Sequence, residues 1–320
     1  MSYLLLILGI ALLIKGADFF VEGASSIARA LHVSPLLIGL TIVAFGTSSP
    51  EATVSIIAAL EENAGVAIGN VVGSNILNIT FVVGITALIN PLKVENETIR
   101  KEIPFTLLAS VALLILVSDV TLQSLEANFI TRSDGFIFLL FFAVFLYYIF
   151  EVARNSREKM KEEASLSNTN APSWGKNSLF TIGGLVAIII GGDLVVDHAT
   201  VIAYSFGMSE TLVGLTIVAI GTSLPELITS ITAAVKKEGD IALGNIVGSN
   251  IFNILFVLGA ASVISPLAVD SKMFVDLILM IVLTLILLVF SRTSFRVGRR
   301  EGTFLVVAYI CYMIYIIVRN

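Results

Sequence analysis

Long apolar runs separated by short polar segments make up most of this chain of 320 residues. Ten runs approach the roughly 20 mostly apolar residues that a membrane-spanning helix needs, so each predicts a transmembrane helix. The pattern therefore predicts an all-α polytopic membrane protein. The ten predicted helices lie at residues 3–30, 35–60, 64–89, 103–118, 130–152, 178–205, 210–235, 240–264, 273–291 and 302–318.

Residues 153–178, "ARNSREKMKEEASLSNTNAPSWGKNS", form the one clearly polar stretch. Its charged residues, serines, asparagines and proline are typical of a flexible linker. This predicted linker divides the chain into two halves, residues 1–152 and 179–320, with five predicted helices each.

Composition supports a membrane protein. The chain is 57% hydrophobic and only 13% charged, whereas about a quarter of the residues in soluble domains are charged. The net charge of −5 is small, and the basic residues lie in loops, so nucleic acid is not an expected partner. The expected surroundings are a lipid bilayer, and the pattern is compatible with a monomer.

Basic residues in the predicted loops orient the chain. If the N-terminus is outside, about 15 lysines and arginines lie on the inner side, and only Arg132, Lys272 and Arg319 lie on the outer side. Cytoplasmic loops carry the excess of basic residues in membrane proteins. We therefore expect a multi-pass protein of the cell membrane with both termini outside.

The two halves are related by an internal repeat. A shift of 175 residues aligns residues 34–92 with 209–267 without a gap, and about 33 of these roughly 59 positions are identical. The repeat unit has five spans, an odd number, so the second half is inverted relative to the first. Inverted repeats with broken helices near the membrane midplane are typical of secondary transporters.

The first repeated motif places a glutamate after a proline, as "GTSSPE" in one half and "GTSLPE" in the other. Pro50 and Pro225 break the helical hydrogen bonding, and a backbone carbonyl freed in lipid needs a partner such as a hydroxyl or a cation. Glu51 and Glu226 then lie at membrane depth, where a carboxylate is costly and usually marks an ion pathway. The motif also adds the hydroxyls of Thr47, Ser48, Thr222 and Ser223.

The second repeated motif is "GNVVGSNILNI", which recurs as "GNIVGSNIFNI". Asn70, Ser74 and Asn78 are four residues apart and share one helix face. Gly69 and Gly73 form a small-xxx-small surface that allows close approach of another backbone. We infer that this helix packs against the broken helix and turns its amides toward it. The matching residues of the second half are Asn245, Ser249 and Asn253.

The combined set of side chains offers only oxygen ligands, without a cluster of cysteine and histidine. Such a set suits a hard cation such as calcium or sodium, and two carboxylates match the charge of one divalent ion. Small and polar residues also pack membrane helices without any ion, but duplication of both motifs at one offset favours an ion site. The remaining repeated acids, Asp18, Glu22, Asp193 and Asp197, are read as charges near helix ends, with Lys15 placed to neutralise Asp18.

Together, "GTSSPE" with "GNVVGSNILN" and "GTSLPE" with "GNIVGSNIFN" resemble the two α-repeats of the calcium/cation antiporter superfamily. The chain looks most like the sodium/calcium exchanger branch in its prokaryotic form, without a large regulatory loop, and the resemblance covers nearly the whole chain. It implies a carrier of sodium and calcium that needs no cofactor. It also implies that spans two, three, seven and eight enclose the ion sites, while long, tilted spans one and six slide across them.

The resemblance implies a role for each matching residue. Glu51 and Glu226 are the shared carboxylates of the sodium and calcium sites. The other implied donors are hydroxyls or carbonyls of Thr47, Ser48, Thr222 and Ser223, carbonyls of Ala44 and Ala219, hydroxyls of Ser74 and Ser249, and amide oxygens of Asn78 and Asn253.

Two features separate this chain from similar branches. Proton-coupled members place a glutamate where this chain has Gly73 and Gly248, and potassium-dependent members carry an aspartate where it has Asn253. The expected function is therefore electrogenic, potassium-independent exchange of sodium for calcium by alternating access. The alternatives are a proton/calcium antiporter of the same fold and a cation channel. An enzyme is not expected, because the chain has no HExxH or GxSxG motif.

Overall fold

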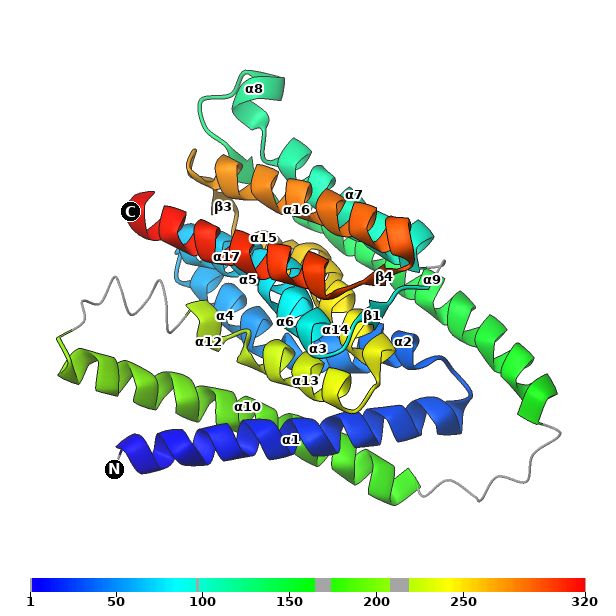
Figure 1. Ribbon diagram of the computed structural model, residues 1–320. Helices are drawn as coiled ribbons and strands as arrows, with labels where there is room; N and C mark the ends of the chain where they lie inside the picture. The colour runs from blue at the N-terminus through cyan, green and yellow to red at the C-terminus, as the bar shows by residue number, and fades with distance from the viewer. Residues whose placement is uncertain (1, 96–97, 165–173, 208–218, 320) are drawn as a thin grey trace.

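The computed structural model describes residues 2–95, 98–164, 174–207 and 219–319. Within these residues, seven helices are long and apolar enough to cross a membrane, and one bent pair of helices adds an eighth span. The protein is a multi-pass helical bundle with two short β-ribbons (Figure 1). The prediction of ten spans exceeds this count because α7 has 14 residues, α13 has 12, and residues 210–218 lie outside the described residues.

The elements follow the apolar runs of the sequence. The first half contains α1 (Ser2–Leu31), α2 (Pro35–Ile38), η1 (Gly39–Val43), α3 (Ala44–Thr47), α4 (Ser49–Leu60), α5 (Ala64–Leu77), η2 (Asn78–Val82), α6 (Val83–Ile89), η3 (Thr98–Glu102), α7 (Ile103–Leu116), α8 (Asp119–Gln123) and α9 (Arg132–Ala164). The second half contains α10 (Trp174–Ser205), α12 (Ala219–Gly221), α13 (Leu224–Val235), α14 (Gly239–Phe252), η5 (Asn253–Leu258), α15 (Gly259–Ile264), α16 (Met273–Ser294) and α17 (Arg299–Arg319).

Both proline motifs interrupt a helix, as the sequence predicts. The segments Pro35–Thr47 and Ser49–Leu60 are bent by 47°, and Ser48 between them leaves the helical conformation. Pro50 lies in the first turn of α4, where its missing N–H removes no helical bond. The break therefore places Glu51 in a first turn, where the helix dipole favours negative charge. The same arrangement recurs in the other half at Ser223, Pro225 and Glu226.

The elements labelled η are π-helical turns, which are wider than α-helical turns, and one of them begins at the end of each copy of the second motif. η2 begins at Asn78 and η5 begins at Asn253, the two asparagines that the resemblance implies as ligands. A π-turn inserts one extra residue into a helix and is frequent at functional sites. The pattern of apolar residues contains no sign of these turns.

The predicted close approach at the second motif occurs in one half. A Cβ atom at Gly248 would lie 2.6 Å from the carbonyl oxygen of Leu40. No described atom lies within 4 Å of such an atom at Gly73, and residue 215, which the repeat aligns with Leu40, lies outside the described residues.

Helices α1 and α10 run antiparallel, side by side, along one edge of the bundle (Figure 1). Glycines allow this contact. A Cβ atom at Gly16 would lie 2.9 Å from the carbonyl oxygen of Gly184, and one at Gly191 would lie 2.8 Å from that of Gly9. The two backbones therefore touch directly, which is a common way for membrane helices to associate.

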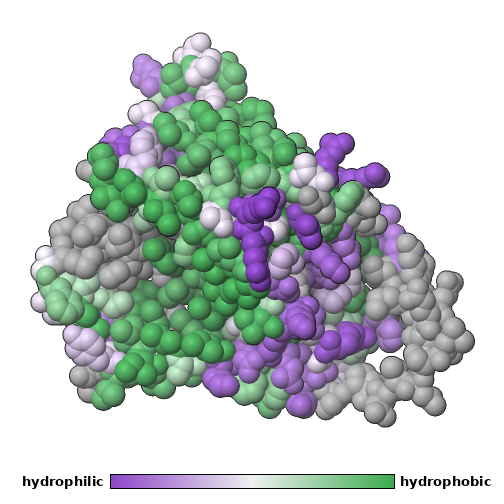
Figure 2. Space-filling view, viewed as in Figure 1, coloured by the Kyte–Doolittle hydropathy of each residue, from purple (hydrophilic) through white to green (hydrophobic). Residues whose placement is uncertain are grey.

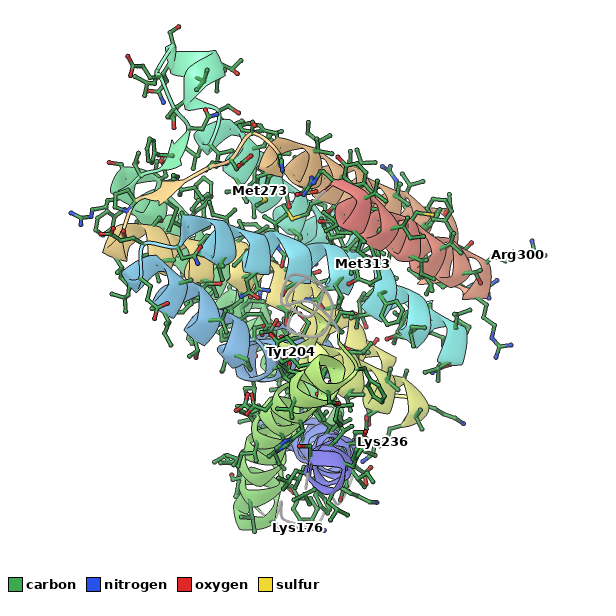
Figure 3. The ribbon with its side chains drawn as sticks, turned by 90° about the vertical axis from the view of Figure 1, so that its left-hand side faces the viewer. Lys176, Tyr204, Lys236, Met273, Arg300 and Met313 are labelled. Atoms are coloured by element: carbon green, nitrogen blue, oxygen red, sulfur yellow. The ribbon has the colours of Figure 1, made fainter. Side chains whose placement is uncertain are left out.

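Ion pairs attach α1 to the end of the broken helix α13. Lys236 Nζ lies 2.7 Å from Asp18 Oδ1 and donates a 2.6 Å hydrogen bond to the Asp18 carbonyl oxygen, and Figure 3 shows its position beside α1. Arg29 forms a second pair with Glu238, at 3.5 Å. The expected pair of Lys15 with Asp18 is present at 4.0 Å, and Lys236 of the other half is a second, nearer partner of the same carboxylate.

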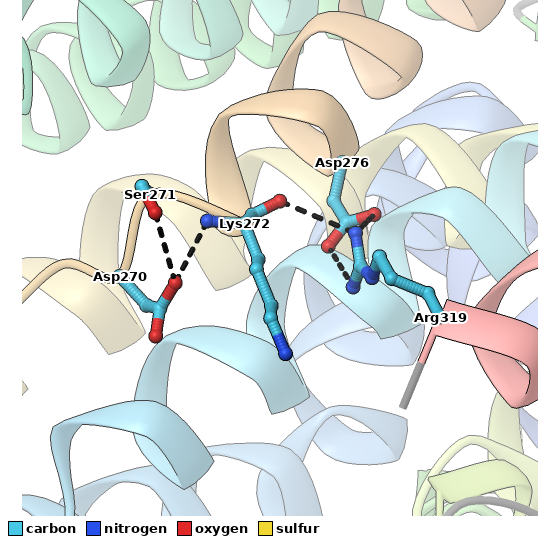
Figure 4. A network of polar contacts seen from close by, with 5 residues as sticks. All are labelled: Asp270, Ser271, Lys272, Asp276 and Arg319. Carbon is cyan, nitrogen blue, oxygen red and sulfur yellow. Dashed lines mark hydrogen bonds and ion pairs between the residues drawn. The ribbon is translucent and has the colours of Figure 1, made fainter.

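Short ribbons and a partly buried ion pair connect the ends of the helices. β1 (Leu92–Lys93) pairs with β4 (Arg296–Val297), and β2 (Phe129–Ile130) pairs with β3 (Leu267–Ala268), each antiparallel. Hydrophilic side chains gather toward the end that carries β1 and β4, and apolar side chains cover most of the rest of this face (Figure 2). Asp276 of α16 holds Arg319 of α17 through two contacts of 3.0 and 2.9 Å (Figure 4).

The polar stretch 153–178 is not a linker throughout. α9 continues to Ala164 and α10 begins at Trp174, while residues 165–173 lie outside the described residues. The segment "REKMKEEA" consists of residues with high helix propensity. The helix therefore continues although its residues become polar. A polar stretch in the sequence does not by itself distinguish a continuing helix from the end of one.

The contact between α1 and α10 predicts a sharp difference between two adjacent glycines. In Gly184→Val the new Cβ atom meets Phe20 N at 2.6 Å and Gly16 O at 2.7 Å, both backbone atoms. We expect a loss of about 1–3 kcal/mol or more from overpacking, seen as a lower unfolding temperature in detergent. Gly183→Val is the matched control, because nothing lies within 4 Å of its Cβ atom. Equal unfolding temperatures for the two variants would contradict this packing.

Candidate cation site

A serine from each proline motif binds the glutamate of the other motif. Ser48 Oγ donates to Glu226 Oε1 at 2.6 Å, and Ser223 Oγ donates to Glu51 Oε1 at 2.9 Å. The partners in these bonds are 178 and 172 residues apart in the chain. The crossed contacts bring both glutamates to one place, between the α3–α4 break and the α12–α13 break.

Asparagines of the second motif hold the backbone at each glutamate. Asn70 Nδ2 donates to the carbonyl oxygen of Glu51 at 3.1 Å and to Ser55 Oγ at 2.9 Å. These contacts fix the start of α4 against α5, so the glutamate has a defined position. The equivalent contacts of the other half measure 3.4 and 3.0 Å and involve Asn245, Glu226 and Ser230.

The two carboxylates are fully buried and only partly satisfied. Glu51 and Glu226 each have an exposed fraction of 0%, and the Oε2 atom of each has no hydrogen-bond partner in the described part of the protein. None of the ion pairs found among the described residues involves either glutamate. A buried charge without a counter-charge costs several kcal/mol, so the pair must be neutralised by a cation or by protons.

The donor set decides which kind of cation fits. No group of three or more His, Cys, Asp or Glu side chains exists within the ranges that the structure describes, so the site does not resemble a zinc or other soft-metal site. The two carboxylates are surrounded by hydroxyl and amide oxygens, which hard cations prefer. Calcium and sodium both suit this set.

Two further predicted hydroxyls lie beside the carboxylates. Ser74 Oγ lies 2.9 Å from Ser223 Oγ, which itself binds Glu51. Ser249 Oγ lies 3.5 Å from Glu226 Oε1 and 3.5 Å from the carbonyl oxygen of Ala44. The second motif therefore faces the first, as its spacing predicts.

The predicted threonines are turned partly away from the carboxylates. Thr47 Oγ1 lies 3.0 Å from Asn245 Oδ1 and 3.1 Å from the carbonyl oxygen of Val43. Thr222 Oγ1 donates to Asn70 Oδ1 at 3.3 Å. Both hydroxyls therefore contact the asparagines that fix the glutamate backbone. Ala219 is the first residue of α12.

The predicted asparagines are buried and leave amide atoms without partners. Asn78 and Asn253 have exposed fractions of 0%. Neither Asn78 Oδ1 nor Asn253 Oδ1 has a hydrogen-bond partner among the described residues. Buried unpaired acceptors of this kind are rare in native proteins and call for a ligand or water.

Sequence reasoning did not assign roles to several residues that the structure brings to the site. Asn70 and Asn245 were expected on the correct helix faces, but a face does not show that an amide binds the glutamate backbone. Ser55 lies four residues after Glu51 and therefore shares its helix face. This spacing is the signal that could have predicted the contact of Ser55 with Asn70. Asn75 and Asn250 form contacts between the halves, which no spacing within one motif indicates.

This fold and this site define a multi-pass membrane protein in which two buried carboxylates meet between the two halves of the chain. Comparison with known proteins gives the family. The sequence pattern of the family "Sodium/calcium exchanger protein" matches residues 1–151 and 176–318, and the chain belongs to this family. The family predicted from the repeated motifs is therefore confirmed.

Two relatives and one solved structure match over nearly their whole lengths. The putative antiporter CaxA of Alkalimonas amylolytica is 43% identical over 313 residues, which cover 96% of this chain and 95% of that protein. The sodium/calcium exchanger MaX1 of Methanosarcina acetivorans is 35% identical over 341 residues, with 98% and 97% covered. Among solved structures, the sodium-calcium exchanger NCX_Mj soaked with zero Na+ and Ca2+ matches with a TM-score of 0.83, 32% identity and 98% coverage of both chains.

Removing one crossed serine contact should destabilise the protein when no cation is bound. Ser48→Ala takes the 2.6 Å donor from a buried Glu226 oxygen, and a lost hydrogen bond to a charged group costs about 1.5–3 kcal/mol. We expect a lower unfolding temperature in detergent with a calcium chelator present. Ser49→Ala is the control, because the hydrogen bond of Ser49 Oγ found in the described part of the protein goes to the Phe45 carbonyl oxygen of α3 and to neither glutamate. If both variants unfold at the same temperature, the contact does not hold the site.

Proposed function

We propose that this protein is a secondary active antiporter that exchanges sodium for calcium across the membrane by alternating access. The observation that carries the proposal is the crossed pair of contacts, in which Ser48 binds Glu226 and Ser223 binds Glu51. They join two buried carboxylates into one site made equally by both halves. Membership of the sodium/calcium exchanger family supports the two ions.

Competition for the carboxylates explains coupling. Calcium and sodium both need Glu51 and Glu226, so the carrier cannot hold full loads of both. A loaded site has its carboxylates neutralised and can cross the apolar layer. An empty site keeps two buried negative charges, which is costly, and so the empty carrier resists the transition. Exchange without leak follows from this difference.

Ten spans in two inverted halves provide the mechanism of alternating access. In support, contacts at Glu51 recur at Glu226 with partners shifted by 175 residues. α1 and α10, which touch through glycines, are in position to slide across the site. An inverted repeat can open to either side by exchanging the conformations of its halves.

Electrogenic exchange requires more than two sodium ions per calcium ion, and the predicted set of oxygens is large enough for several ions. Calcium takes six to eight oxygen ligands, and the predicted set of Glu51, Glu226, Thr47, Ser48, Thr222, Ser223, Ala44, Ala219, Ser74, Ser249, Asn78 and Asn253 exceeds that number. Gly73, Gly248 and Asn253 stand where similar carriers that use protons or potassium have acids, which favours sodium alone. The excess of basic residues in the predicted inner loops places both termini outside the cell membrane.

Calcium uptake by vesicles tests the coupling. Proteoliposomes loaded with sodium should take up radioactive calcium when diluted into sodium-free buffer, and a positive inside potential should change the rate because the exchange moves net charge. Adding or removing potassium should leave the rate unchanged. Uptake that follows a pH gradient without sodium would instead assign the proton/calcium alternative, and single-channel currents would assign a channel.

Loss of one site charge should stop exchange. We expect Glu51→Gln and Glu226→Gln each to lower calcium uptake by roughly a hundredfold or more, since removing one of two desolvated charges costs several kcal/mol. The matched control is Glu61→Gln, which changes an exposed residue in the turn after α4 and should leave uptake near the wild-type rate. Wild-type rates in either site variant would remove these glutamates from the ion site.

A further inference from the structure

Four asparagines lie together where the second motif of one half meets that of the other. Asn75 and Asn78 come from α5 and η2, and Asn250 and Asn253 come from α14 and η5. All four have exposed fractions of 1% or less. The resemblance implies ligand roles for Asn78 and Asn253, whereas Asn75 and Asn250 have no assigned role.

Asn75 contacts the other half through both ends of its amide. Its Nδ2 donates to the carbonyl oxygen of Asn250 at 3.3 Å, and its Oδ1 accepts from Asn253 Nδ2 at 3.2 Å. This bond fixes the orientation of the Asn253 amide, so its oxygen points away from Asn75 and remains for another partner. That oxygen is buried and has no hydrogen-bond partner among the described residues.

The equivalent contact on the other side is not made. The repeat matches Asn75 Oδ1 with Asn250 Oδ1, and Asn253 Nδ2 with Asn78 Nδ2. Neither Asn250 Oδ1 nor Asn78 Nδ2 has a partner in the part of the chain that the structure describes. The two halves therefore differ in their contacts here, although the repeat aligns asparagine with asparagine at both positions.

We propose that Asn75 and Asn250 are positioning residues that act alternately. In the present conformation Asn75 aims the oxygen of Asn253 into the cation site. When the carrier opens to the opposite side, Asn250 takes the amide nitrogen of Asn78 and aims its oxygen in the same way. The proposal rests on the proposed exchange function, since exchange of conformations between inverted halves produces the alternation. The π-turns that begin at Asn78 and Asn253 are suited to this change, because such turns are frequent at functional sites.

Sided transport measurements test the alternation. Full-length Asn75→Ala and Asn250→Ala proteins are compared in right-side-out and inside-out vesicles, with calcium uptake driven by a sodium gradient. Asn75→Ala should raise the KM for calcium about tenfold on one face of the membrane and less than about twofold on the other. Asn250→Ala should show the opposite sidedness. The value of kcat should change less than KM in both.

Two comparisons separate positioning from general damage. In Asn75→Ala with Asn253→Ala, KM should be no higher than in Asn253→Ala alone, because Asn75 acts only through Asn253. Asn90→Ala removes another asparagine contact between the halves, from Asn90 Nδ2 to the Ala234 carbonyl oxygen at 3.4 Å, and should leave KM unchanged on both faces. Asn75→Ser, with a side chain too short to reach Asn253, should repeat the one-sided change if Asn75→Ala does not fold.

The outcomes are distinct. If the wild-type protein exchanges sodium for calcium but Asn75→Ala changes KM equally on both faces, or not at all, the alternation is wrong and the proposed function stands. If the wild-type protein shows no sodium-driven calcium uptake, the proposed function itself is wrong. Additive effects in the double variant would also overturn the positioning role.

Discussion

Two like charges buried together without a basic partner are the constraint on which the rest of this structure depends. Glu51 and Glu226 are both inaccessible to solvent, so the protein must hold them in place and still leave them incomplete for a cation. Each lies directly after a proline in the first turn of its helix, where the helix dipole favours negative charge. Serine from the opposite half binds one oxygen of each carboxylate and leaves the other oxygen unpaired.

The symmetry of the site contrasts with the asymmetry of its surroundings. Around the glutamates the two halves use the same residue types, because both copies of the repeat keep the same two motifs. Farther out, Lys236 holds Asp18 of α1, whereas the repeat places Glu61 at the position of Lys236 and Asp193 at that of Asp18. Opposite charges attach α1 to its neighbour, whereas the two matching positions, in α10 and directly after α4, both carry negative charge.

The structure adds three features that the pattern of apolar and polar residues does not predict. α9 extends into the polar stretch, since its Glu, Lys and Met residues favour helix in water as well as in lipid. The expected pair of Lys15 with Asp18 is present, and a lysine 218 residues farther along the chain than Asp18 adds a nearer partner that the sequence did not predict. The π-turns at Asn78 and Asn253 follow from packing between helices, and the apolar pattern does not contain that information.

The residue pattern alone establishes the membrane class, the repeat, the helix breaks and the two glutamates, because each depends on local chemistry: long apolar runs, proline without an N–H, and carboxylates in apolar surroundings. It also gives the correct family through the repeated motifs. Tertiary structure decides which residues of one half bind those of the other. Ser48 with Glu226, Asn75 with Asn253 and Asp18 with Lys236 are contacts between segments far apart in the chain, and their geometry depends on how the two halves pack together.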